Sequence, residues 1–136
     1  MVVANRRGYA MHKSRLAALV IDCQTDDLEP HVRFWSAALG YEADPAADTA
    51  NGKYTEFKVP GDDMKVLLQK VQHPSRVHLD IETDDVDAEV ARLEKLGAKR
   101  VEKVETWVVM EAPSGHRFCV VRQQRPLLAQ NGNEWP

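Results

Sequence analysis

Apolar residues recur at helical spacing in two segments of the chain. Over about residues 28–39 they step by four, three and four, which predicts one buried stripe: Leu28, Val32, Trp35 and Leu39. Over about residues 86–96 a second stripe consists of Val86, Val90, Leu93 and Leu96. A glycine follows each segment and is typical of a helix end. We therefore expect two helices, the second with this solvent-exposed face: Glu89, Arg92, Glu94 and Lys95.

Strands are predicted on both sides of each helix. Before the second helix, Val77, Leu79 and Ile81 alternate with polar residues, so we expect the apolar set beneath that helix and the polar set on the opposite face. The polar set is His78, Asp80 and Glu82. The other predicted strands are residues 15–23, 53–59, 64–71, 98–101, 106–111 and 116–122, with a short extended piece near Tyr41 and a loop over 44–51.

The two halves of the chain also match in sequence. The segment VIDCQTDDL from Val20 aligns with HLDIETDDV from His78 at an offset of 58 residues, so Asp22 corresponds to Asp80. The same offset places Leu19, Ile21 and Cys23 beneath the first helix. The sequence therefore predicts an α+β fold in which two tandem β-α-β-β-β modules form a curved mixed sheet around a cavity. We expect one domain, 1–136, with module one over about 14–72, module two over about 75–123 and a tail over 124–136.

Composition and charge exclude several classes of protein. Lys and Arg number 18 against 21 Asp and Glu, and a net charge of −3 argues against a general nucleic-acid binder. No apolar run approaches the ~20 residues that cross a bilayer, and no apolar stretch of a secretory signal follows the first arginines. Cys23 and Cys119 follow no metal or redox spacing, which favours reduced thiols in a cytoplasmic protein. The expected partners are a small-molecule ligand and a second copy of the chain as a homodimer, with no nucleic acid and no membrane.

Several short motifs then occur in a fixed order. They are Phe34-Trp35 with Leu39-Gly40, Arg76-Val-His-Leu-Asp80, Leu96-Gly-Ala98, Trp107-Val-Val-Met110, Pro113-Ser-Gly115 and Phe118-Cys-Val-Val121. With this order and spacing, about residues 15–123 resemble the vicinal oxygen chelate superfamily, which includes glyoxalase I, extradiol dioxygenases and bleomycin-resistance proteins. The resemblance is closest to its glyoxalase-like branch of short two-module proteins.

The resemblance implies a metal position that can be followed residue by residue. Metal-using members hold a divalent ion with four side chains, one from the opening and one from the closing strand of each half. His78 and Cys119 fall on the two positions of the second half, and Val20 falls on the opening position of the first. The register of the first closing strand leaves Leu67, Leu68 and Gln69 open, of which only Gln69 has a donor atom. Because Val20 cannot bind a metal, we expect a retained pocket without a metal cofactor.

Several candidate site residues have two possible roles. The candidate ligand-binding residues are Val20, Phe57, Gln69, His78, Asp80, Trp107 and Cys119. His78 either meets a ligand as a hydrogen-bonding group or base near pH 7, or is a satisfied core histidine. Asp22 and Asp80 either form an acid/base pair or bind backbone N–H groups and arginines such as Arg76. The remaining histidines are expected in loops, turns or on a helix surface: His12, His31, His73 and His116. No residue is assigned a catalytic role.

Three functions remain open on these grounds. We favour a metal-independent small-molecule-binding protein, like the drug-sequestering members of the superfamily. The second is a lyase, isomerase or dioxygenase with a non-standard metal site or an acid/base group at His78. The third is a protein-interaction domain whose pocket is filled by side chains. The tail, with Arg125 and Trp135, is expected to pack on its own domain or on a second subunit.

Overall fold

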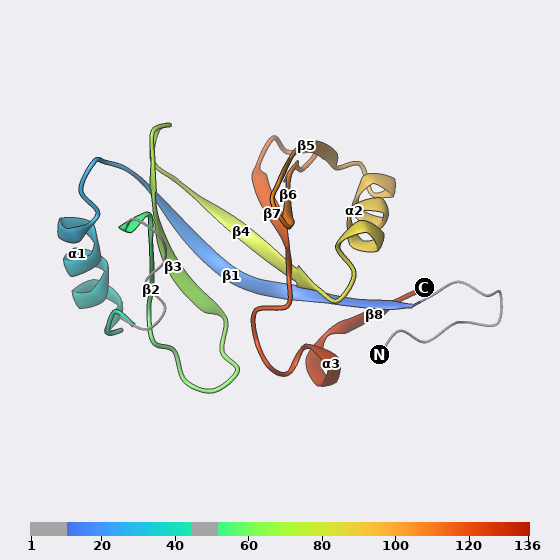
Figure 1. The fold of residues 1–136 in the computed structure, drawn as a ribbon, viewed down its shortest axis with the longest axis horizontal. Helices are drawn as coiled ribbons and strands as arrows, with labels where there is room; N and C mark the ends of the chain where they lie inside the picture. The colour runs from blue at the N-terminus through green and yellow to red at the C-terminus, as the bar shows by residue number, and fades with distance from the viewer. Residues whose placement is uncertain (1–10, 45–51) are drawn as a thin grey trace. The chain divides into compact units, whose positions relative to one another are not determined.

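A computed structural model describes residues 11–44 and 52–136 of the chain (Figure 1). Almost all of the predicted loop over 44–51 therefore lies outside the described residues. The chain divides into two compact units, one of residues 18–78 and one that combines the chain up to Ala17 with residues 79–136. The strands β1 (His12–Gln24) and β4 (Arg76–Thr83) run through both units. Within the described residues, no helix is long and apolar enough to cross a membrane.

The unit of residues 18–78 contains one helix on a small sheet. Its elements are the second part of β1, α1 (Glu29–Leu39), β2 (Tyr54–Glu56) and β3 (Lys65–Val71), with strand order β2-β3-β1. β3 runs parallel to β1 and antiparallel to β2, and a bridge from Ala43 to Phe57 supplies the extended piece predicted near Tyr41. Figure 1 shows α1 alongside these strands.

The core of this unit lies beneath α1. Ile21 and Cys23 are buried there together with Leu28, Phe57 and Leu68, and Leu19 and Trp35 pack against them. The predicted positions of Leu19, Ile21 and Cys23 under the first helix are thus confirmed. The helix itself starts one residue after Leu28 and ends at Gly40, whose φ of 74° is a left-handed conformation that favours glycine.

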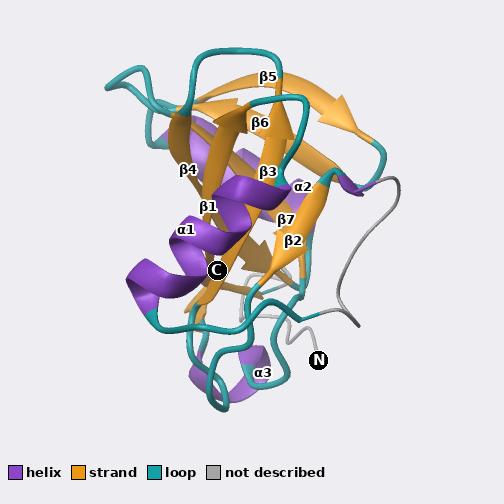
Figure 2. Cartoon of the chain, turned by 90° about the vertical axis from the view of Figure 1, so that its left-hand side faces the viewer, coloured by secondary structure: helices purple, strands orange, loops and turns teal. Residues whose placement is uncertain are grey.

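The other unit repeats the same order of elements. It contains the end of β4, α2 (Val86–Lys95), β5 (Lys99–Val104), β6 (Trp107–Glu111) and β7 (Arg117–Arg122), with strand order β4-β7-β6-β5. β7 is parallel to β4, and both pairs that involve β6 are antiparallel. The Asp85 side chain caps α2 by accepting a hydrogen bond of 3.0 Å from the Ala88 N–H. Figure 2 shows the helices and strands of the chain by colour.

One part of the predicted burial is wrong. Ile81 packs against the core of this unit, but Val77 and Leu79 are 52% and 43% exposed. The reason is that α2 packs mainly on β5, β6 and β7 and leaves most of β4 uncovered. All strands within the described residues belong to one eight-stranded mixed sheet, which confirms the α+β class. The cavity between the modules stays a prediction.

The tail packs on its own chain. It forms a short helix α3 (Leu128–Asn131) and a strand β8 (Asn133–Trp135), which pairs antiparallel with the start of β1 (Figure 1). Leu128 is buried, and the Trp135 indole N–H donates to the Ser14 hydroxyl at 2.8 Å. The guanidinium of Arg92 lies 3.9 Å from the centre of the Trp135 ring. These contacts fix the tail on the unit to which it belongs.

Two buried carboxylates hold this region together. Glu82 accepts hydrogen bonds from the backbone N–H groups of Gln124 and Arg125 and from the side chains of Arg15 and Arg125. Burial alone would raise the pKa of Glu82, but these hydrogen bonds outweigh it and hold the pKa below the ordinary value. Glu82 is fully buried, so its charge depends on these partners.

Glu89 is the second buried carboxylate, and the prediction that it faces solvent is wrong. It is fully buried on α2, where it contacts His12 Nε2 at 2.8 Å and accepts two hydrogen bonds of 2.8 Å from Arg92. Burial raises its pKa, but the bonds with Arg92, His12 and Ser14 bring the pKa below the ordinary value. His12 is itself 3% exposed within β1, so its predicted place in a loop, turn or helix surface is also wrong.

Candidate functional site

Strand register shows which residues of the two modules correspond. Asp22 on β1 lies opposite Gln69 on β3, and Asp80 on β4 lies opposite Cys119 on β7. Because the sequence repeat already equates Asp22 with Asp80, Gln69 is the counterpart of Cys119. This resolves the open register of the first closing strand. Leu68 instead belongs to the core under α1.

Asp22 and His78 form the central contact of the unit of residues 18–78. Nδ1 of His78 lies 2.8 Å from Oδ2 of Asp22, whose side chain is 2% exposed. The same oxygen lies 3.9 Å from Nε2 of His73 and 3.9 Å from Nε of Arg76. An ionised carboxylate only accepts hydrogen bonds, so Nδ1 of His78 is the donor in this contact. Of the two alternatives for Asp22, the structure supports contacts with basic side chains.

The segment that joins the two modules brings His73 and Arg76 to this carboxylate. The backbone N–H of Gln24, at the end of β1, donates to the Ser75 hydroxyl at 2.9 Å. The Gln24 side chain donates to the backbone carbonyl of Gln72 at 2.7 Å. These bonds hold the start of β4 beside the end of β1. Oδ1 of Asp22 is buried and has no hydrogen-bond partner among the described residues.

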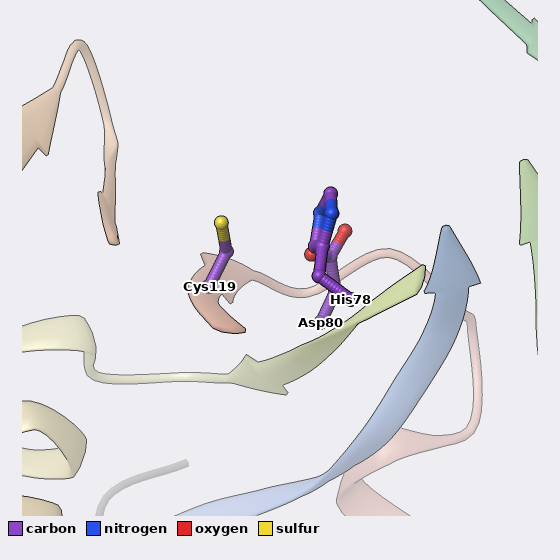
Figure 3. Close-up of side chains that lie close together, drawn as sticks. All are labelled: His78, Asp80 and Cys119. Atoms are coloured by element: carbon purple, nitrogen blue, oxygen red, sulfur yellow. The ribbon is translucent and has the colours of Figure 1, made fainter. Parts of the chain in front are cut away.

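Three of the predicted site residues converge on β4 and β7. One ring nitrogen of His78, one carboxylate oxygen of Asp80 and Sγ of Cys119 lie within 4.8 Å of one another. His78 and Asp80 are two residues apart on a single strand, and Figure 3 shows all three side chains pointing to the same side of the strands. Each side chain is half-buried. The group therefore offers nitrogen, oxygen and sulfur donors at one point.

The four positions that the resemblance implies for a metal do not form a matching set here. Val20 has no donor atom, and it lies opposite Leu67, which has none either. The side-chain amide of Gln69 donates to the Tyr54 hydroxyl at 3.1 Å. Only His78 and Cys119 remain from the mapped set. The donor set therefore does not fit the two-module metal centre of the superfamily.

The other predicted site residues separate into two groups. Trp107 lies on β6 two residues before Val109, which is opposite Cys119, so Trp107 belongs to the face that carries Cys119. Phe57 is 1% exposed and packs beneath α1 with Ile21. Its contact with a ligand stays a prediction.

Three contributors were not among the predicted site residues: Asp22, Tyr54 and His73. Tyr54 is the partner of Gln69, and His73 lies beside Asp22. For Asp22 the sequence does contain a signal, because the repeat places it on the same face as Val20. His73 and Tyr54 belong to a joint and to a short strand, and no spacing rule connects such residues with β1.

A groove of about 400 Å³ lies elsewhere, at the N-terminal end of α2. Its lining carries Asp84, Asp85 and Asp87 together with Lys103 and Arg122. With Glu105, the lining has four acidic side chains against two basic ones, and the groove contains none of the residues around His78. It therefore indicates no ligand class.

Two helix-covered β-α-β-β-β modules with polar side chains gathered on their opening and closing strands are the architecture of the vicinal oxygen chelate superfamily. Residues 18–121 match a family model described as a glyoxalase-like domain. The chain therefore belongs to the glyoxalase-like domain family of that superfamily. No curated protein matches the chain.

Solved structures resemble the chain in fold. A hypothetical protein from Bacillus halodurans C-125 is 10% identical, with 83% of this chain and 96% of that chain covered and a TM-score of 0.59. The Mn(II)-bound glyoxalase from Novosphingobium aromaticivorans is 19% identical, with coverage of 82% and 40% and a TM-score of 0.58. A methylmalonyl-CoA epimerase from Mycobacterium tuberculosis is 17% identical, with coverage of 84% and 90% and a TM-score of 0.57. At these identities the likeness shows the fold alone.

Proposed function

We propose that this protein binds a small organic ligand at the face centred on His78, without the four-ligand metal centre of its superfamily. The observation that carries the proposal is the 2.8 Å contact between His78 and the buried carboxylate of Asp22. A buried carboxylate fixes the orientation and the tautomer of the imidazole. Such a group is prepared to accept a hydrogen bond from a ligand through Nε2.

Neighbouring side chains on β3 support a polar ligand. Lys65, Leu67 and Gln69 alternate with core residues, so they share one face of the strand. Lys65 pairs with Glu56 at 2.6 Å, and Gln69 with Tyr54. This face offers both charged and neutral hydrogen-bonding groups beside the apolar Val20 and Leu67. It suits a small molecule with an apolar body and polar substituents.

A thermal-shift screen of organic acids and aromatic metabolites against the full chain tests this function. A ligand present at 100 times its dissociation constant should raise the free energy of unfolding by about 2.7 kcal/mol. The substitution His78→Ala should abolish that increase. The control is His116→Ala, because His116 lies on an exposed turn and pairs only locally with Ser114. The proposal fails if no compound stabilises the protein, or if His78→Ala leaves the stabilisation intact.

The second candidate is a lyase, isomerase or dioxygenase with a non-standard ligand set. The convergence of His78, Asp80 and Cys119 favours it, because three protein donors suffice for a catalytic metal. Metal analysis of protein purified without an affinity tag separates the two candidates. Stoichiometric metal together with turnover of a bound compound would replace the binding function by the enzymatic one.

We also propose a homodimer located in the cytoplasm. The exposed apolar side chains Val77, Leu79 and Phe34 are compatible with burial in a second copy. Sedimentation velocity of the full chain tests the dimer. A single species with the mass of one chain at high concentration would refute it.

A further inference from the structure

We propose that Arg76 binds the carboxylate or phosphate group of the ligand, so that the compound recognised at this face is a small organic anion. The inference rests on the proposed function, because it names the class of ligand that binds beside His78. Asp22 is the positioning carboxylate that holds the guanidinium of Arg76 in place. These side chains and the neighbouring His73 all belong to the unit of residues 18–78.

The guanidinium of Arg76 lies beside a carboxylate without a hydrogen bond to it. Its Nε is 3.9 Å from Oδ2 of Asp22, beyond the range of about 2.7–3.2 Å for an N–H···O bond. Nδ1 of His78 already contacts that oxygen at 2.8 Å. The two terminal NH₂ groups of Arg76 make no hydrogen bond within the described residues. Because the side chain is 48% exposed, a ligand can reach these donors.

Arginines next to the buried glutamates behave differently. Arg125 donates to Glu82 at 2.8 Å, and Arg92 donates two hydrogen bonds of 2.8 Å to Glu89. A guanidinium presents its N–H donors in a planar fork that matches the two oxygens of a carboxylate or phosphate. Arg76 keeps this fork available although a buried carboxylate lies close by. Its geometry therefore suits an oxyanion from outside the chain better than a structural ion pair.

The charges at this point are layered from the interior towards solvent. The Asp22 side chain is 2% exposed, whereas those of His78, His73 and Arg76 are 12%, 37% and 48% exposed. An approaching anion thus meets basic side chains before it meets the carboxylate. Oδ1 of Asp22 has no hydrogen-bond partner among the described residues, so the basic groups around Oδ2 balance the charge of Asp22.

One small molecule can contact Arg76 and His78 together. The two residues are two positions apart on β4, so they share one face of that strand. Both side chains also reach the same oxygen of Asp22. The anionic group of the ligand therefore binds at the start of β4, with its apolar body beside Val20 and Leu67. A compact carboxylic acid or phosphate monoester meets these requirements.

Binding of three small probes to the full-length protein tests this preference. Benzoate, phenyl phosphate and benzamide share an aromatic ring and differ in the group that it carries. An NMR titration that follows the Nε–Hε resonance of Arg76 should show saturable binding of at least one of the two anions at millimolar concentration. Benzamide, which has the shape of benzoate without its charge, should bind about 10-fold more weakly or worse. Tighter binding of benzoate identifies a carboxylic acid, and tighter binding of phenyl phosphate identifies a phosphate ester.

Substitutions at Arg76 separate the guanidinium from the rest of the face, with affinities taken from the resonances of the probes. Arg76→Met should weaken binding of the anion by about 10–100-fold and leave benzamide binding unchanged. Arg76→Lys keeps a positive charge near Asp22 but lacks the fork, so it should weaken the anion by about 3–10-fold. It provides the comparison if Arg76→Met does not fold. Arg33→Met is the matched control, because Arg33 is an exposed arginine of α1 that pairs with Glu29, and it should leave the affinity unchanged.

The anion preference is refuted if neither anion binds, if benzamide binds as tightly as the anions, or if the folded Arg76 variants keep full affinity. Suppose that neutral compounds stabilise the protein in a manner that depends on His78, while both anions fail to bind. The anion preference is then wrong and the binding function stands. If instead an anion binds through Arg76 and His78→Ala leaves its affinity unchanged, the anion site stands and the function centred on His78 is wrong.

Discussion

Nδ1 of His78 lies 2.8 Å from Oδ2 of Asp22, although the two residues are 56 positions apart in the chain. The contact joins the opening strands of the two modules, on which the sequence repeat matches Asp22 with Asp80 and Val20 with His78. In the first module the repeat has a carboxylate at 22 but an apolar residue at 20, whereas the second has both Asp80 and His78. The polar chemistry of this face is therefore divided unequally between the two modules.

The first prediction concerns the tautomer of His78. In the unmodified protein the proton should lie on Nδ1, because the Asp22 carboxylate accepts from it. Asp22→Asn offers an amide N–H as well as a carbonyl, so the fraction with the proton on Nε2 should rise. Long-range ¹⁵N–¹H correlation spectra of the imidazole at neutral pH measure that fraction. Asp26→Asn, at an exposed residue, is the control, and an unchanged His78 tautomer in Asp22→Asn would contradict the assigned contact.

The second prediction separates the core from the ligand face. Phe57→Ala should lower the free energy of unfolding by about 3–5 kcal/mol, because it leaves a cavity under α1. Any ligand that depends on His78 should bind this variant with unchanged affinity at temperatures where it is folded. Trp107 is half-buried on the face that carries Cys119. Trp107→Ala should therefore weaken ligand binding and lower the free energy of unfolding much less than Phe57→Ala does. Chemical denaturation and calorimetric titration of both variants provide the comparison.

Much of the fold follows from local pattern, and the parts that do not have identifiable reasons. Apolar stripes and the following glycines place both helices to within about a residue, because helix periodicity and C-terminal glycine act locally. The register of β3 was not accessible, since Leu67 and Leu68 are both apolar and alternation cannot distinguish them. The structure pairs Asp22 with Gln69 and thereby decides it.

Long-range charge contacts were the main source of error. Glu89 carries the pattern of an exposed helix residue. Its burial depends on His12, 77 positions earlier, on Ser14 and on the nearby Arg92. The candidate site was anticipated as a set of residue types, including His78, Asp80 and Cys119. The contact between His78 and Asp22 was not anticipated. Residues predicted to share one face of a sheet need not have side chains that touch.

The third prediction is a loss of stability in acid. The pKa values of Glu82 and Glu89 are held below the ordinary value in the folded protein. Below about pH 4.3, where free glutamate titrates, the unfolded chain takes up protons that the folded chain does not. The two carboxylates therefore stabilise the fold above that pH, and this contribution is lost as the pH falls through their folded pKa values.

Urea denaturation between pH 3 and pH 6 checks this acid response. Glu82→Gln and Glu89→Gln should each flatten the dependence of the unfolding free energy on pH. Glu94→Gln, at an exposed position of α2, should leave the slope unchanged. Equal slopes in all four proteins would show that the buried carboxylates do not carry the acid response.

The fourth prediction concerns Arg125, which attaches the tail to β4. Its side chain is 8% exposed and donates to Oε2 of Glu82 at 2.8 Å. Arg125→Met removes the positive charge of Arg125 from a fully buried carboxylate. It should lower the free energy of unfolding by about 3 kcal/mol, the lower end of the range for a broken buried ion pair. The lower end applies because Arg15 still pairs with Glu82. Arg122→Met, at an exposed residue, should change it by less than about 0.5 kcal/mol. Similar losses in both variants would contradict the role of Arg125.

The pairing of β8 with β1 has a consequence for how the chain meets other copies of itself. β3 pairs with β1 only from Ala18 onwards. At the start of β1, the strand β8 pairs with His12, Lys13 and Ser14. The Lys13 carbonyl also accepts a hydrogen bond from the Thr83 hydroxyl. Without the tail, the start of β1 would present an open sheet edge with unpaired backbone donors and acceptors, which is a template for strand addition. The last residues of this chain thus serve as a built-in blocking strand, and a chain that ended near Gln124 would be prone to domain swapping and aggregation even while its site remained intact.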